Sequence, residues 1–259
     1  MIKQNSVFSL KSLKMNFSEK RKIVLDTFPQ VCGMSGYDMV CLLQKQFNHK
    51  ENDLNLDQEV QVKNAFDLLI SENEETSDAI KEKDFKELRD GIGDQLTVAH
   101  FLAFKINGLN EATLLECPIK PTSYQQHYDL CTSKLKKLQS ALLVEKNITL
   151  AQEAMNEYIS ELYNVPESTQ FNIDDDLLEI TISSLGKVCE SMELAERTLK
   201  AYQERGYVVH IEQSEHGYII LVSEDCVVNG KHIPKGKFLK SLEFIEVEFK
   251  DVEENPIWN

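Results

Sequence analysis

The chain has 259 residues, of which 42% are hydrophobic, and a formal net charge of -15 at pH 7. Such an acidic chain is a poor match for nucleic acid, because contacts to a phosphate backbone need clustered lysine and arginine. No run of 18 apolar residues occurs, so no membrane-spanning helix is expected. The six cysteines are scattered without a C-x-x-C pair, which favours reduced thiols over a disulfide framework or a zinc site.

Residues 1–22 are basic and lack the continuous apolar segment of a signal peptide. A cytoplasmic protein is therefore expected.

Helical periodicity dominates the middle of the chain. The stretch YDMVCLLQKQF predicts a short helix at 37–47. Apolar residues then recur at three- and four-residue steps, which predicts helices at about 57–81 and 85–106 joined by a short polar turn. The recurring apolar residues of the first are Val60, Ala65, Leu68, Leu69, Ala79 and Ile80, and the stripe predicted to face the core also includes Val62. After the linker CPIKPTS, two more helices are expected at about 123–146 and 149–163.

The composition changes toward the C-terminus. The acidic run at 174–176 is expected to be a loop, and 191–206, with an early Ser and a terminal Gly, a helix. Three β-branched and aromatic segments follow at 207–212, 217–223 and 225–234, the last with Asn229-Gly230 as a hairpin turn. The predicted fold is mainly α, with a small antiparallel sheet in a C-terminal α+β appendage.

Two acidic clusters fall on the helices at 57–81 and 85–106. Glu72 and Glu75 are three residues apart and therefore neighbours on one helix face, and they interrupt the stripe that is predicted to face the core. Glu87, Asp90 and Asp94 also share one face, at i, i+3 and i+7. Acids within an apolar stripe are costly unless they are paired or bind a metal.

A hairpin of the two helices would bring these clusters together, which suits a hard cation such as Mg²⁺ or Mn²⁺. The alternative is that both clusters are solvated faces of an acidic protein. Glu74 and Asp78, on another face, are expected to point into water.

Other polar residues receive structural interpretations. His100 lies off the line of the acids and is expected at a helix surface or an interface. Solvated helix faces are expected for Lys134, Lys136, Lys137, Glu153, Glu157 and Glu161.

The stretch LLISENEETSDAIKEKDFKELRDGIGDQLTVAHFLAFKING resembles the all-α nucleoside triphosphate pyrophosphohydrolases. The nearest branch is the MazG-like, phosphoribosyl-ATP pyrophosphohydrolase-like proteins common in phages and some bacteria. The motif positions matched are Glu72, Glu75, Ala79, Ile80, Asp84, Glu87, Leu88, Asp90, Asp94, Leu96 and Val98. In many MazG proteins a glutamate would stand at Gly91, so Asp90 must serve in its place.

The C-terminal part resembles the tail of the same phage branch. The matched residues are Lys187, Cys189, Gly236, Lys237, Leu239, Lys240 and Ser241. Ser184 and Gly186 replace an Asn and a Ser of that pattern, which leaves the substrate preference open. The resemblance covers about half of the chain, and residues 118–172 have no counterpart in it.

The resemblance implies an all-α NTP pyrophosphatase helical core at 37–116, preceded by an N-terminal extension at 1–36. Additional helices at 117–172 and the appendage at 173–259 would follow. The implied activity is Mg²⁺-dependent hydrolysis of a (deoxy)nucleoside triphosphate to the monophosphate and pyrophosphate, with water attacking the α-phosphorus. The implied role is nucleotide-pool metabolism in the cytoplasm, of a bacterial host if the protein is phage-encoded.

The resemblance also implies roles for individual residues. Glu72, Glu75, Asp90 and Asp94 would bind the metal, and Glu72, Glu75 and Glu87 would be catalytic. Glu87 would be either a further ligand or the group that orients water, while Lys187 and Lys240 would contact substrate phosphates. Relatives form dimers or tetramers, so a homodimer or homotetramer is expected, unless the helices at 123–163 complete a bundle within one chain.

Three alternatives stay open. The chain could be a non-catalytic nucleotide-binding or sensing protein on the same fold, a phosphoribosyl-ATP pyrophosphohydrolase, or a structural helical adaptor.

Overall fold

The computed structural model describes residues 16–251, 257 and 258, so the first fifteen residues of the expected N-terminal extension lie outside the described part. The helices are α1 (Phe17–Thr27), α2 (Gly36–Gln46), α3 (Glu59–Glu82), α4 (Phe85–Lys105), α5 (Tyr124–Gln139), α6 (Ile148–Tyr163), α7 (Ile173–Leu185) and α8 (Met192–Glu204). The strands are β1 (Val209–Ser214), β2 (Gly217–Val222), β3 (Cys226–Val228), β4 (Lys231–Ile233) and β5 (Phe238–Leu239). A 3₁₀ turn at Pro29–Gly33 precedes α2, and a π turn at Ser140–Val144 ends α5.

The periodic segments form helices as predicted. The helices predicted at 37–47, 57–81, 85–106, 149–163 and 191–206 are confirmed to within about two residues at each end. The segment at 123–146 is α5 followed by the π turn. Among the residues described, no helix combines the length and apolarity needed to cross a membrane.

Two helices differ from the prediction. The loop expected at 174–176 is wrong, because these acids form the first turn of α7. Asn172 Oδ1 accepts hydrogen bonds from the backbone N–H groups of Asp174 and Asp175, and negative charge is favourable at a helix N-terminus. α1 was not predicted at all, although Asn16 and Glu19 form a reciprocal capping box at its start.

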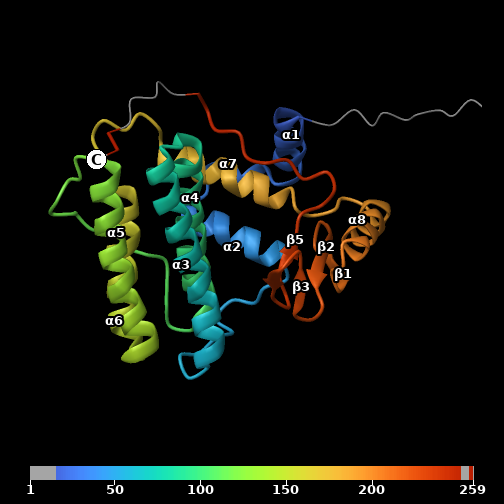
Figure 1. The fold of residues 1–259 in the computed structure, drawn as a ribbon, viewed down its shortest axis with the longest axis horizontal. Coiled ribbons are helices and arrows are strands. Elements are labelled where there is room, and N and C mark those ends of the chain that lie inside the picture. Colours follow the sequence, from blue (N-terminus) through green and yellow to red (C-terminus); the bar gives the residue numbers. More distant parts are fainter. Residues whose placement is uncertain (1–15, 252–256, 259) are drawn as a thin grey trace, which may run out of the picture.

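A bundle of four helices, α3 to α6, lies at the centre of the molecule. α3 and α4 form an antiparallel hairpin, and the α5–α6 pair packs alongside it, α5 on α3 and α6 on α4 (Figure 1). The helices within 123–163 thus complete a bundle with the α3–α4 hairpin in one chain. α2 and α7 pack against α4 and against each other.

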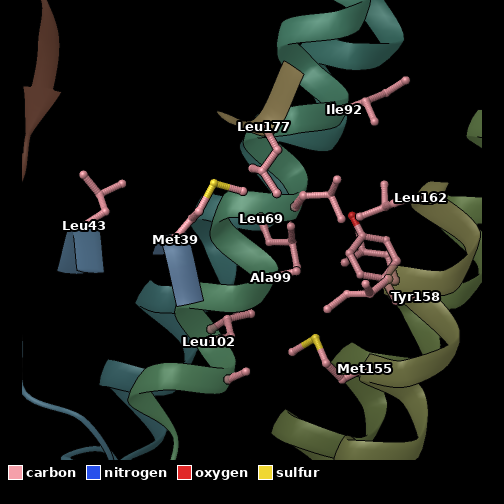
Figure 2. Close-up of a cluster of buried hydrophobic side chains, with 14 of the residues drawn as sticks. Met39, Leu43, Leu69, Ile92, Ala99, Leu102, Met155, Tyr158, Leu162 and Leu177 are labelled. Carbon is pink, nitrogen blue, oxygen red and sulfur yellow. The ribbon is translucent and has the colours of Figure 1, made fainter. Parts of the chain in front are cut away.

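The main core lies where these helices meet. Figure 2 shows side chains from five helices converging there: Met39 and Leu43 of α2, Leu69 of α3, Ile92, Ala99 and Leu102 of α4, Met155, Tyr158 and Leu162 of α6, and Leu177 of α7. α7 therefore belongs to the main core through its own buried residues.

The expected small sheet is confirmed at the C-terminal side. β1 and β5 flank β2 in one antiparallel sheet, and β3 pairs with β4 around Asn229-Gly230, both of which have positive φ. α8 packs on β1 and β2 and closes a second, smaller core. The segment after β5 returns to the helices, where Val247 packs with Phe17 of α1 and Ile180 of α7.

The buried stripe of α3 differs in part from the predicted one. Its buried residues are Val62, Phe66, Leu69, Asn73, Thr76, Ala79 and Ile80. Val60 and Leu68, predicted to face the core, are 68% and 48% exposed. The stripe runs about one residue away from the expected line, because α4 and α5 both contact the face that carries Asn73 and Thr76.

Candidate active site

The α3–α4 hairpin turns tightly, and this fixes the register of the two helices. Lys83 ends α3 in the left-handed region at φ 57°, and the side chain of Asp84 accepts a hydrogen bond of 3.1 Å from the backbone N–H of Glu87. A Cβ at Gly91 would lie 2.5 Å from Thr76 Oγ1, so only glycine permits this close approach of α4 to α3.

A buried hydrogen-bond chain crosses the seam between the helices. The Tyr158 hydroxyl of α6 donates to Gln95 Oε1 over 2.7 Å, and Gln95 Nε2 donates to Thr76 Oγ1 over 2.7 Å. The Thr76 hydroxyl in turn donates to the backbone carbonyl of Glu72 over 2.9 Å. Satisfied polar chains of this kind rigidify a core. Here the chain holds Glu72 opposite the α4 turn that carries Asp94.

Three predicted acids come together at this seam: Glu72, Asp90 and Asp94. Burial raises the pKa of Glu72 to about 8, with further contributions from the negative charges of Asp94, Glu75 and Asp90. Burial raises the pKa of Asp94 to about 7, and the negative charge of Asp90 contributes to this shift. Burial also raises the pKa of Asp90 to about 6, and the negative charges of Glu87 and Glu246 contribute to this shift. All three acids are partly buried and lie near like charges, and both conditions disfavour the charged carboxylate.

Two predicted acids, Glu75 and Glu87, lie at the exposed rim of this group. The charge of Glu75 acts on Glu72 and Asp94, and the charge of Glu87 acts on Asp90. Glu75 therefore does not face the core, contrary to the sequence interpretation. Glu74 and Asp78 are exposed as predicted, and Asp78 pairs with Lys81 over 2.8 Å.

Both predicted lysines lie beside the acids. Lys187 follows the C-terminal end of α7, where burial lowers the pKa of its ammonium group while the negative charge of Asp94 acts in the opposite direction. Lys240, just after β5, is exposed and lies close enough for its charge to act on Asp90 and Asp94. Its Nζ also contacts Glu246 Oε1 at 2.6 Å.

We call these five acids and two lysines the acid site: Glu72, Glu75, Glu87, Asp90, Asp94, Lys187 and Lys240. Among residues 16–251, 257 and 258, no three acidic, imidazole or thiol groups converge closely enough to hold a metal ion as the side chains stand. The donors nevertheless fit Mg²⁺ in their chemistry, because all are carboxylate oxygens and their mutual repulsion is only partly balanced by Lys187.

Of the other polar residues that were predicted to lie at the surface, some are exposed and some are buried. His100 is not at a surface but 4% exposed, because it lies beside Gly36 and Tyr37 of α2. Glu161 is also buried, contrary to prediction, and its carboxylate accepts a hydrogen bond from Asn164. Lys134 and Lys137 both pair with Glu157 across α5 and α6, while Lys136 and Glu153 are exposed as expected.

Sequence reasoning missed the groups that support the acids. Thr76, Gln95 and Tyr158 were not singled out, although Thr76 and Gln95 are polar residues on otherwise apolar helix stripes, which is a readable signal. Glu246 was also missed, and no local pattern marks it. No family model matches the sequence, and no match was found among curated proteins or solved structures. The family resemblance therefore rests on the sequence motifs alone.

Proposed function

We propose that the protein is a Mg²⁺-dependent hydrolase that converts a nucleoside or deoxynucleoside triphosphate into the monophosphate and pyrophosphate. The observation that supports this most is the partly buried group of Glu72, Asp90 and Asp94 beside Lys187. Carboxylates next to a cationic side chain on two rigid helices suit a substrate that arrives as a metal–triphosphate complex.

The residues divide by burial. Glu72, Asp90 and Asp94 would hold the ion, and Lys187 and Lys240 would contact phosphate oxygens. When bound, Mg²⁺ would offset the charge of the triphosphate and polarise its phosphoryl oxygens. Glu75 and Glu87 lie at the exposed rim, where a carboxylate can orient the attacking water or accept its proton. Attack at the α-phosphorus breaks its bond to the bridging oxygen and releases pyrophosphate.

The second candidate is a nucleotide-binding protein without turnover, which would use the same acids and lysines to bind the metal–nucleotide complex. This candidate predicts Mg²⁺-dependent nucleotide binding with no pyrophosphate release.

Hydrolysis in H₂¹⁸O tests the proposal. A panel of ribo- and deoxyribonucleoside triphosphates and phosphoribosyl-ATP is incubated with Mg²⁺, and the products are analysed by mass spectrometry. The proposal expects pyrophosphate release with ¹⁸O in the monophosphate. Label in the pyrophosphate, or release of inorganic phosphate instead, would contradict attack at the α-phosphorus. Nucleotide binding without turnover would favour the second candidate.

A further inference from the structure

A cavity of about 480 Å³ lies apart from the acid site and shares no residue with it. It opens where the starts of α2 and α7 meet α6 and the loop that follows α4. Its volume is that of a small-molecule site. Val31, Met34, Met39, Ile159 and Leu178 supply much of its apolar wall.

His100 is one of the residues that line this cavity. Its Nδ1 is buried and has no hydrogen-bond partner among the described residues. The point that a Cβ of Gly36 would occupy lies 3.3 Å from His100 Nε2 and 3.4 Å from the Tyr163 hydroxyl oxygen. Leu177 Cδ2 lies 2.8 Å from the same point, so Gly36 allows His100, Tyr163 and Leu177 to meet closely at the cavity wall. Burial lowers the pKa of His100 to about 4, so its ring is neutral and can accept a hydrogen bond.

The charges that line the cavity are all negative. They belong to Glu111, Asp174 and Asp175, and neither lysine nor arginine is among its lining residues. Asp175 pairs with Lys250 over 2.7 Å, whereas Asp174 accepts a hydrogen bond from the Tyr163 hydroxyl and Glu111 lies exposed at the rim. Two carboxylates are thus available to a cation.

An anion finds fewer partners here. Two helix N-termini border the cavity, but side chains already cap some of their amide groups. Ser35 Oγ accepts from the Asp38 amide, and Asn172 Oδ1 accepts from the amides of Asp174 and Asp175. These caps occupy part of the usual anion site at each helix start.

The walls suit an organic cation. Met34 and Met39 provide polarisable thioethers, and Tyr37 and Tyr163 provide aromatic rings. We propose that the cavity binds a small primary amine with an apolar body, whose ammonium group lies between Glu111, Asp174 and His100.

Calorimetric titration of the whole chain tests this site with two probes of similar size, 2-phenylethylamine and 3-phenylpropionate. The amine is expected to bind saturably at one site, and the carboxylate is not. Glu111→Gln and Asp174→Asn should each weaken the amine about tenfold, which is the effect of losing one favourable charge contact. Gly36→Ala would place a Cβ 2.8 Å from Leu177 Cδ2 and 3.3 Å from His100 Nε2, so it should displace these side chains at the cavity wall and also weaken binding.

Glu116→Gln is the matched control, because it removes the same charge from the same exposed loop without lining the cavity. It should leave the affinity unchanged. If Gly36→Ala does not fold, Glu111→Gln decides. Failure of the amine to saturate at millimolar concentration, equal affinity for 3-phenylpropionate, or an equal loss in Glu116→Gln would overturn the proposal.

Discussion

At the scale of single residues, the carboxylates of Glu72 and Asp94 do not by themselves stabilise the folded state. Each is partly buried beside other negative charges, and burial of a charge is costly unless it is compensated. A proton or a cation can supply that compensation. The two carboxylates should therefore respond to both pH and divalent ions.

The first prediction concerns the metal-free protein. The folded-state pKa values of Glu72 and Asp94 are about 8 and 7, above the ordinary values of 4.5 and 3.8. The folded state therefore binds more protons in this range, and the contribution of these groups to the unfolding free energy falls as the pH rises from about 4 to about 8. Mg²⁺ competes with these protons, so it should raise the Tm more at pH 8.5 than at pH 6.

Scanning calorimetry with and without Mg²⁺ checks this. Glu72→Gln should abolish most of the Mg²⁺ effect and, without metal at pH 8.5, stabilise the fold by on the order of 2 kcal/mol. Glu74→Gln, an exposed neighbour, should behave as the wild type. An equal Mg²⁺ effect at both pH values would contradict the assignment.

His127 gives a prediction of opposite sign. It is fully buried in α5, with Nε2 2.9 Å from the carbonyl oxygen of Glu161, and burial lowers its pKa to about 4. Because the unfolded chain binds the proton more readily, its contribution to stability is lost as the pH falls from about 6.5 to about 4. His127→Gln keeps a donor for Glu161. Between pH 6.5 and pH 4, the unfolding free energy of the variant should fall less than that of the wild type. Urea titrations should show a difference between the two decreases on the order of 2 kcal/mol.

At the scale of elements, Arg89 ties α4 to α7 and to the C-terminal segment. Its guanidinium donates to both oxygens of Asp176, at 2.7 and 2.6 Å, and to the carbonyl of Lys250 at 3.0 Å. It also lies 4.6 Å from the ring centre of Phe249. Since breaking a buried pair leaves an uncompensated charge, Arg89→Met should cost about 3–5 kcal/mol in chemical denaturation.

The control for Arg89 is Lys81→Met, which removes an exposed i,i+3 pair with Asp78. That change should cost no more than about 0.5 kcal/mol. If the two variants lose equal stability, Arg89 does not join these elements energetically.

The contact of Gly91 with Thr76 gives the fourth prediction. Gly91→Ala would place a Cβ within 2.5 Å of Thr76 Oγ1 and push α3 from α4. The strain should exceed the gain in helix propensity and cost about 1–3 kcal/mol by denaturant titration. It should also weaken Mg²⁺ binding, because Glu72 and Asp94 lie on opposite sides of this seam. Gly33→Ala, where nothing lies within 4 Å, should do neither.

Periodicity predicted most helices because each helix of the bundle buries one stripe, and the strands were predicted from their β-branched and aromatic residues together with the Asn229-Gly230 turn. The loop predicted at 174–176 is wrong, because a run of three acids also stabilises the N-terminus of a helix, here α7. Periodicity also placed Leu68 in the core, because a one-residue shift of the stripe depends on which helices pack against α3. Tertiary contacts decide such cases, and they are not local in sequence.

At the scale of the whole molecule, segments far apart in the chain meet at the acid site. The helical spacing of Glu72, Asp90 and Asp94 was readable, since two helices joined by a short turn must lie side by side. The approach of Lys187 and Lys240 was expected from the resemblance alone. Glu246 could not be anticipated, because the return of the segment after β5 to the helices is a property of the complete fold.

Pyrophosphate release from nucleoside triphosphates with Mg²⁺ tests the central claim most directly when the wild type is compared with Glu72→Gln and Glu74→Gln. These changes remove the same charge two residues apart, one at the α3–α4 seam and one in water. We predict turnover by the wild type, a loss of about a hundredfold or more in kcat/KM for Glu72→Gln, and a change below about twofold for Glu74→Gln. Absence of turnover with every nucleotide, or equal activity of the two variants, would contradict the account.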